Sequence, residues 1–407
     1  MTPRRARIPS LVGALHPRPL DWLNFLAAAL QTSFGPFVVV YLTAHQWTQV
    51  SVGLALSVGT VTGMVSQIPA GALIDAIPVK RVAAGIAIVA IGLAALGLGL
   101  RPQPLPVLLA EILQGAAACM VMPAIAAMSL NRVGAGGAGV RLGRNASWAA
   151  LGNGLASGVM GVIGYYISEQ VVFLFAGALA LPTLYALVRI GPPRRHVRAE
   201  NTPVAASPAR PLWRLFLDRR LLAFAGCAVL FQFANAPMLQ LLGSALTRRD
   251  GMAASAIIGA CLVVPQLVVA VFSPAVGRAA GRWGRRPVLI LAFIALPLRG
   301  LLFTVVGNAA LLLPVQALDG ISGAAFGVLT PLIAADIARD SGRFNLWMGS
   351  FGLAGGIGAS ISTTLAGSVA DHFGSNAAFL FLTAVGVALV LLAALALPET
   401  GRGSGEA

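Results

Sequence analysis

Residues 82–100 read VAAGIAIVAIGLAALGLGL, an apolar run without a single charged side chain. About 20 apolar residues in helical geometry cross the hydrocarbon core of a bilayer, so this run predicts a membrane-spanning helix. It is bounded by Lys80-Arg81 on one side and by Arg101 on the other, as expected where a span meets water. The run decides the fold class, because only helices and closed barrels satisfy their own backbone within lipid.

The composition of the whole chain agrees with a membrane protein. Of 407 residues, 57% are hydrophobic and 10% are charged, whereas a soluble domain carries about 25% charged residues. The net charge of +15 does not predict a nucleic-acid partner, because the charges lie in short segments between apolar runs. The three cysteines lie within apolar runs and lack the spacing of metal ligands or of a disulfide framework. We expect no metal and no cofactor.

The pattern of residues 82–100 recurs along the chain. It predicts an all-α membrane protein of twelve transmembrane helices in two pseudo-symmetric six-helix bundles. The predicted spans are residues 22–43, 50–74, 82–100, 104–128, 145–167, 171–190, 220–244, 252–276, 287–306, 309–337, 345–369 and 376–398.

The longest polar interruption lies near the middle of the chain. Residues 191–219 are rich in Pro, Arg and Ala and have the composition of a linker. They divide the chain into an N-terminal bundle over residues 1–190 and a C-terminal bundle over residues 220–407.

Lys and Arg predict the orientation, because basic residues accumulate in cytoplasmic loops. If the N-terminus is cytoplasmic, the 28 Lys and Arg residues all face the cytoplasm except Arg101, Arg248 and Arg249 outside, and Arg299 within a span. We therefore expect a multi-pass protein with both termini in the cytoplasm and residues 191–219 as a cytoplasmic linker. High Ala, Gly and Arg usage suggests a bacterial source, hence the inner membrane.

The two halves carry related motifs in the same order. The offsets between them lie between 200 and 206 residues. Duplicated halves are common in secondary transporters, whose substrate site lies between the repeats near mid-membrane. The pairs are Gln31–Pro36 with Gln232–Pro237, Pro69–Gly71 with Pro274–Gly277, Glu111–Gly115 with Gln316–Gly320, and Asn145–Gly152 with Asn345–Gly352.

The connection after the second span reads Gly71-Ala-Leu-Ile-Asp75-Ala-Ile-Pro-Val-Lys80-Arg81. It resembles the loop signature of the major facilitator superfamily: a Gly, an Asp four residues later, then a basic cluster. The connection after the eighth span resembles a degenerate copy, with Gly281 where the Asp would fall. The resemblance implies that the loop Asp contacts the start of helix eleven and holds the outward-facing state. The implied gating residues are Gly71, Asp75, Arg81, Gly277, Arg282 and Arg285.

Two alternatives to gating remain open for these residues. Asp75 could be a solvated loop charge that serves topology only. The arginines could mainly enforce orientation.

Ionisable side chains deep in a span are costly and are functional candidates by default. Three occur: Glu111 in the fourth predicted span, Arg299 in the ninth and Asp319 in the tenth. An apolar environment favours an uncharged carboxyl, so a carboxyl whose exposure alternates can take a proton from one side and release it to the other. We expect Glu111 and Asp319 to couple protons to transport. The alternative is a carboxylate satisfied by a neighbouring hydroxyl, amide or structural ion pair.

Polar side chains in the spans that face the cavity in the resembled family are candidates for substrate contact. Hydrogen bonding between helices is the alternative for the amides, and snorkelling or a carboxylate partner is the alternative for Arg299. Phe34 and Phe231 could supply apolar wall. The substrate-binding candidates are Asn24, Gln31, Gln114, Gln232, Asn235 and Arg299.

Together these features predict a secondary active transporter that moves a small molecule by alternating access. An enzyme is not expected, because no span carries a catalytic constellation, and no phosphate-binding loop of a primary pump occurs. The first-half loop signature favours proton-coupled efflux by antiport. Proton-coupled uptake of a metabolite or organic anion is the alternative. The expected partners are the substrate, protons and the lipid bilayer, and the short external loops favour a monomer.

Overall fold

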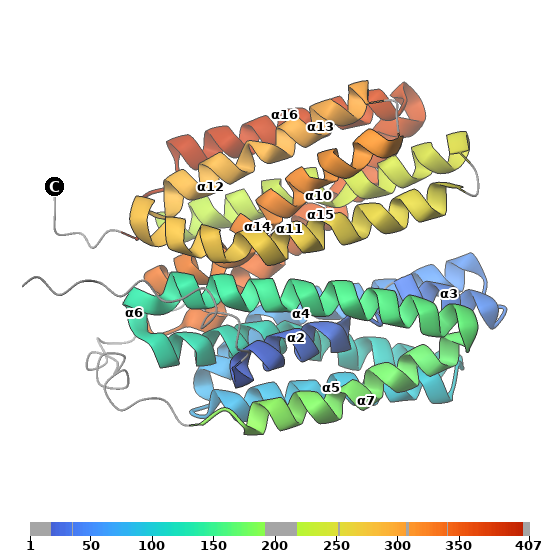
Figure 1. Ribbon diagram of the computed structural model, residues 1–407, viewed down its shortest axis with the longest axis horizontal. Helices are drawn as coiled ribbons and strands as arrows, with labels where there is room; N and C mark the ends of the chain where they lie inside the picture. Colours follow the sequence, from blue (N-terminus) through green and yellow to red (C-terminus); the bar gives the residue numbers. More distant parts are fainter. Residues whose placement is uncertain are drawn as a thin grey trace, which may run out of the picture.

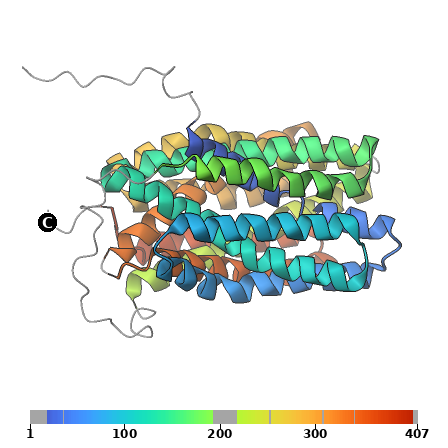
Figure 2. The ribbon, with the colours of Figure 1, turned by 90° about the horizontal axis from the view of Figure 1, so that it is seen from below.

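The computed structural model describes residues 18–34, 36–191, 218–250, 253–306, 309–339 and 341–401. Within these ranges the regular elements are helices, which run along the long axis of the molecule (Figure 1). The first half of the chain forms one layer, coloured blue to green, and the second half forms the other, yellow to red. Figure 2 shows the same arrangement from below. Almost all of the predicted linker, residues 192–217, lies outside the described residues.

The helices divide between two bundles. The first bundle contains α2 (Pro19–Gln31), α3 (Pro36–Ala44), α4 (Gln49–Ala76), α5 (Lys80–Leu100), α6 (Pro104–Tyr166) and α7 (Glu169–Val188). The second bundle contains α10 (Arg219–Asp250), α11 (Ala253–Trp283), α12 (Arg285–Phe293), α13 (Ala295–Val305), α14 (Ala309–Ala338), α15 (Phe344–Phe373) and α16 (Ser375–Leu395).

The predicted fold class is confirmed. Eleven helical segments of the described residues are long and apolar enough to cross a membrane. The first predicted span is missing from these because it is broken: α2 and α3 have 13 and 9 residues, with a turn over residues 32–34 between them. Pro36 opens α3, where its missing backbone N–H costs no helical hydrogen bond. The twelve predicted helices are all accounted for.

The connection between the fourth and fifth spans is shorter than predicted. The stretch labelled α6 consists of two helices, Pro104–Gly134 and Gly136–Tyr166, so most of residues 129–144 are helical. The chain turns back at Gly134, whose φ of 66° and ψ of −177° are strained for residues with a Cβ. Arg141 and Arg144, expected in a loop, therefore lie on a helix, and Arg141 is buried.

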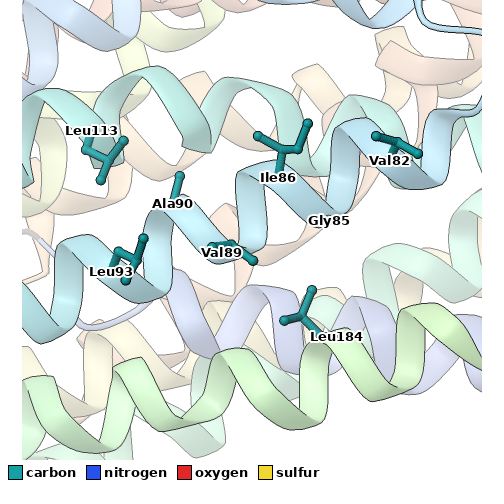
Figure 3. Close-up of a pocket in the computed structure, with 8 residues that line it drawn as sticks. All are labelled: Val82, Gly85, Ile86, Val89, Ala90, Leu93, Leu113 and Leu184. Atoms are coloured by element: carbon teal, nitrogen blue, oxygen red, sulfur yellow. The ribbon is translucent and has the colours of Figure 1, made fainter.

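Each bundle has its own apolar core. The first includes Leu23, Ile88 and Phe173, and the second centres on side chains such as Phe224 and Phe351. Large apolar side chains also cover the outer surface. A shallow groove on α5, lined by residues such as Ile86, Val89 and Leu93, has almost no polar lining (Figure 3). Such a surface suits lipid chains.

Glycines bring the two bundles into backbone contact at two equivalent places. Gly71 on α4 lies so close to Asn345 on α15 that a Cβ there would collide with the Asn345 carbonyl. Gly277 on α11 meets Gly139 on α6 in the same way. Small residues permit such close approach between membrane helices.

These contacts fix the register of the internal repeat. Gly349 meets Gln67 as Gly143 meets Ser273, and all four contacts of this kind correspond at one offset, 206 residues. Asn345 therefore corresponds to Gly139, and the predicted pairing of Asn145 with Asn345 is out of register.

The first helices are also shifted from the predicted pairing. Gly152 meets Phe25 as Gly358 meets Val229, which sets an offset of 204 between α2 and α10. Gln31 then corresponds to Asn235 rather than to Gln232. The pairing of Glu111 with Gln316 is in register, because Gly115 abuts the Gly59 carbonyl as Gly320 abuts the Pro265 carbonyl.

The glycine contact between α11 and α6 predicts that a larger side chain at position 277 destabilises the protein. Gly277→Val should destabilise this arrangement by about 1–3 kcal/mol, because the added carbons would collide with the Gly139 backbone. Gly158→Val is the matched control, since nothing lies within 4 Å of a Cβ at that position. Thermal unfolding of the purified protein measures both. Equal melting temperatures for the two variants would contradict the contact.

Candidate functional site

Three predicted site residues meet inside the second bundle. Arg299 on α13 forms an ion pair with Asp319 on α14, and its Nη2 donates to Oδ1 of Asn235 on α10 at 2.8 Å. Arg299 is only 1% exposed, whereas the Asp319 side chain retains 25% exposure. Of the alternatives for Arg299, the structure shows the carboxylate partner. The guanidinium serves as the counter-ion of the more accessible Asp319.

The surroundings of Arg299 explain why a charge can lie there. Its Nε contacts Sδ of Met238 at 3.3 Å, and its guanidinium lies 5.9 Å from the centre of the Phe303 ring. A buried ion is tolerated only when a partner of opposite charge and further hydrogen bonds replace water. Asp319 and Asn235 supply both, so the three side chains form one unit.

Glu111 on α6 has a different environment. It is 4% exposed, has no ion-pair partner among the described residues, and its Oε1 is buried without a hydrogen bond. The carboxyl group lies against Gly59 on α4, where any side chain would collide with Oε2. A lone carboxylate in such surroundings is costly, so the neutral acid is the form that they accommodate. Glu111 and Asp319 therefore have different neighbours: Gly59 of α4 for Glu111, and Arg299 of α13 for Asp319.

The repeat register shows that carboxyl and amide groups exchange places between the halves. Gln316 occupies on α14 the position of Glu111 on α6, and its Nε2 donates to the Cys261 carbonyl at 3.2 Å. Asp319 in turn corresponds to Gln114, which is half-buried. Each half thus carries one carboxyl and one amide a turn apart, in opposite order.

The structure does not bring the remaining amides together. Asn24 is fully buried in the first bundle and donates to the Leu20 carbonyl at 2.6 Å. Gln31 donates to the Ala27 carbonyl of its own helix at 3.1 Å. Gln232 lies against Gly355 on α15. Only Asn235 joins a charged cluster, and the roles of the others in substrate binding stay predictions.

The aromatic residues expected to form a cavity wall are in the cores instead. Phe231 stacks on Phe293 and Phe326 of its own bundle, with ring centres 5.5 Å and 4.3 Å apart. Phe34 is buried in the core of the first bundle. Neither exposes a face that could form the predicted wall.

Asp75 lies where the family resemblance implies. Its Oδ1 accepts from the backbone N–H of Asn345 at 3.0 Å and from Asn345 Nδ2 at 2.6 Å. Its Oδ2 accepts from the N–H of Leu346 at 2.9 Å. These N–H groups belong to the first turn of α15, where a carboxylate both satisfies free donors and is favoured by the helix dipole. Asp75 thereby joins the two bundles.

Lys80 fixes the end of α4 that carries Asp75. Its Nζ donates to the carbonyls of Ile74, Asp75 and Ile77 at 2.6, 3.1 and 3.0 Å. Carbonyl groups at a helix C-terminus lack partners within the helix, and a cation satisfies them. Lys80, the first residue of the basic cluster after Asp75, therefore caps α4.

The other predicted gating residues differ from Asp75. Gly71 and Gly277 lie at the contacts between bundles described above. Arg285 instead bonds Asp336 on α14 at 3.1 Å and the Ala280 carbonyl at 2.7 Å, both within its own bundle. Arg81 and Arg282 form no hydrogen bond or ion pair within the part of the chain that the structure describes. The arginines do not join the two bundles there.

Sequence reasoning missed a buried ionic cluster between α2 and α6. Asp21 pairs with Arg141 and with Arg144, each at 2.6 Å, and Arg141 also donates to Asn145, which donates to Ser129. Asp336, the partner of Arg285, was missed as well. Asp21 and Arg141 are 120 residues apart, and no local pattern predicts their pairing.

Comparisons with known proteins agree with this architecture. The model of the Major Facilitator Superfamily matches residues 20–261 and again residues 229–407. An uncharacterized MFS-type transporter of Mycobacterium tuberculosis is 35% identical over 389 residues, which cover 94% of this chain and 93% of that protein. The crystal structure of the human organic anion transporter MFSD10 (TETRAN) has a TM-score of 0.68 at 15% identity, over 93% of this chain and 100% of that chain.

Two shorter similarities involve resistance proteins of Escherichia coli. The class E tetracycline resistance protein is 30% identical over 142 residues, 35% of this chain and 34% of that protein. The class B protein is 35% identical over 117 residues, 28% of this chain and 29% of that protein. Each covers about a third of the chain.

The contact of Asp75 with α15 predicts a conformational shift. Asp75→Asn should weaken the contact by about 1.5–3 kcal/mol, because it removes the charge from the hydrogen bonds at the helix N-terminus. Spin labels at the exposed Val79 and Arg339, in a background without the native cysteines, report the separation of the bundles. We expect more long distances in Asp75→Asn. Asp371→Asn, an exposed carboxylate of α15, is the control; identical distributions in all three proteins would contradict the contact.

The Arg299–Asp319 pair predicts non-additive effects on stability. Arg299→Gln should cost toward the lower end of about 3–5 kcal/mol, because it leaves a partly buried carboxylate without its counter-ion. Adding Asp319→Asn should recover much of the loss, since neither charge then remains. Thermal unfolding of the two single variants and the double variant measures the coupling. Strictly additive losses would contradict the pair.

Proposed function

Because this chain belongs to the major facilitator superfamily, we propose that it is a secondary active transporter that exports a small molecule by alternating access in exchange for protons. The observation that carries the proton coupling is the buried carboxyl of Glu111, which has no ion-pair partner among the described residues. A structural carboxylate would be expected to have such a partner, as Asp21 does.

Alternating access is supported by where the bundles touch. The glycine contacts and the Asp75 contact lie toward the end of the molecule at which α4 ends and α15 begins. Toward the other end of the same bundles, nothing lies within 4 Å of a Cβ at Gly158 or at Gly367. The contacts between the bundles run from the end at which α15 begins to about the middle of the helices, where Met64 of α4 meets Gly356 and Ser360 of α15. With the orientation predicted from Lys and Arg, this end is cytoplasmic and the arrangement is outward-facing.

Two carboxyl groups in two environments suit a coupled cycle. Glu111 would hold a proton while it is buried and release it when movement of α4 against α6 admits water. Asp319 would exchange Arg299 for a proton or for a cationic group of the substrate, because it is the more exposed member of its pair. Protons taken up from one side of the membrane and released to the other side would drive the substrate in the opposite direction.

Export is favoured over uptake by the partial similarity to the tetracycline resistance proteins. Uptake in symport with protons is the second candidate, since a carboxyl can couple either direction. We further propose that the protein acts as a monomer in the inner membrane with both termini in the cytoplasm.

Transport in liposomes tests the coupling. A ligand is first selected by its effect on thermal unfolding, with tetracycline in the panel, because a ligand of the folded state raises the melting temperature. An outwardly directed proton gradient should then drive its accumulation in proteoliposomes, and Glu111→Gln and Asp319→Asn should abolish this gradient-driven accumulation. Uptake driven by an inward gradient would instead indicate symport.

A third carboxyl provides the matched control. Glu169→Gln makes the same chemical change in the first turn of α7, at the end of a span, and should leave transport unchanged. Gradient-driven transport that persists in both Glu111→Gln and Asp319→Asn would contradict the proposed coupling.

A further inference from the structure

A second groove lies on the second bundle, where α11 passes into α12. It encloses about 520 Å³, and its lining includes Trp283, Arg286, Pro287, Ile290, Leu291 and Glu399. None of these residues belongs to the transport site or to the contacts between bundles. The groove differs from the one on α5 in Figure 3, because it combines an apolar wall with charged groups.

The groove crosses the boundary of the membrane. One apolar span ends at Trp283 and the next begins at Arg285, so its charged end lies at headgroup level. From Arg286 to Ile294 it follows α12 and its junction with α13 for about 12 Å at 1.5 Å per residue. Leu291 and Ile294 are 64% and 46% exposed there. The wall thus runs from the interface into the hydrocarbon layer.

The charged end of the lining carries Arg286 and Glu399. Arg286 donates to the Ala394 carbonyl, while its Nε is buried without a hydrogen-bond partner. Arg278 and Arg282 are exposed on the last turns of α11 but do not line the groove. Trp283 is 59% exposed, in the position that tryptophan favours at membrane interfaces.

Glu399, the acidic residue of the lining, already has partners. Its Oε1 accepts from the backbone N–H of Arg285 and of Gly401, each at 2.8 Å, and its Oε2 accepts from the N–H of Arg286 at 3.1 Å. The carboxylate caps α12, and the helix dipole offsets its charge. Glu399 is thus occupied by backbone N–H groups, and the Arg286 guanidinium forms no ion pair within the described residues.

We propose that this groove binds an anionic phospholipid, with the phosphate beside Arg286 and Trp283 and one acyl chain along Ile290, Leu291 and Ile294. A soluble anion would leave the apolar wall uncovered. A zwitterionic lipid would cover the wall but would bring no net charge to Arg286. Basic pockets beside membrane helices select anionic headgroups in this way.

Native mass spectrometry of the whole protein tests the site. The protein in neutral detergent is titrated with an equimolar mixture of phosphatidylglycerol and phosphatidylcholine, and the retained lipids are counted. Wild type should prefer phosphatidylglycerol, and Arg286→Gln should lower that preference about fivefold, the effect of one basic residue at a membrane surface. Arg286→Lys keeps the charge and should keep most of the preference.

Two further variants separate the groove from general electrostatics. Leu291→Trp leaves the charge unchanged but fills the apolar wall, and should also lower the preference. Arg189→Gln removes an exposed arginine at the end of α7, away from the groove, and should leave it unchanged. Equal retention of the two lipids by wild type, or an equal loss in Arg189→Gln and Arg286→Gln, would overturn the proposal. If Arg286→Gln does not fold, the lipid preference of Leu291→Trp is compared with that of Arg189→Gln, and equal preferences would overturn the proposal.

Discussion

The arrangement of the two bundles depends on backbone contact at glycines. Helices in lipid gain little from burying apolar side chains against each other, so close packing has to hold them together. Gly71 against Asn345 and Gly277 against Gly139 supply that packing at two equivalent places. The first of these contacts also brings the start of α15 within reach of the Asp75 carboxylate. Without the close approach of the backbones, the hydrogen bonds of Asp75 could not form.

The halves share this scaffold but differ in their charges. Glu111 corresponds to Gln316, and Gln114 corresponds to Asp319. Each carboxyl therefore occupies the position that an amide occupies in the other half. Asp319 has Arg299 as its counter-ion, while Glu111 lies against a glycine of α4. A duplicated chain can therefore place two carboxyl groups in different environments at nearly equivalent points.

Much of the fold could be predicted, because apolar runs, basic connections and a midpoint linker are local signals. The contact of Asp75 was implied by a motif of eleven residues. The break before Pro36 was not predicted, and Pro237 lies inside the unbroken α10. The turn at Gly134 could not be predicted, since its surroundings read as an ordinary polar connection. The predicted register of the repeat was off by three residues in one helix pair and six in another. It relied on similar polar residues in the two halves, which do not reveal which glycines are in contact.

The candidate site was predictable only in part. Ionisable residues at membrane depth pointed to Glu111, Arg299 and Asp319, but not to which of them form a pair. The bonds of Asp21 to Arg141, and of Arg285 to Asp336, join residues far apart in sequence. Phe34 and Phe231 were expected to line a cavity but lie in the bundle cores. The assignment of a residue to a cavity helix does not tell whether its side chain points into the cavity or into the core.

Gly281 occupies the place that Asp75 occupies in the first half, offset by 206 residues. The contact of α4 with α15 is thus held by a charged group as well as by packing. The contact of α6 with α11 has packing alone at the corresponding position. Dissolved salt weakens interactions of charged groups near the surface but leaves van der Waals contact unchanged. A change in ionic strength would then weaken the contact of α4 with α15 and spare that of α6 with α11. The molecule would part along α4 and α15 while α6 and α11 serve as its hinge.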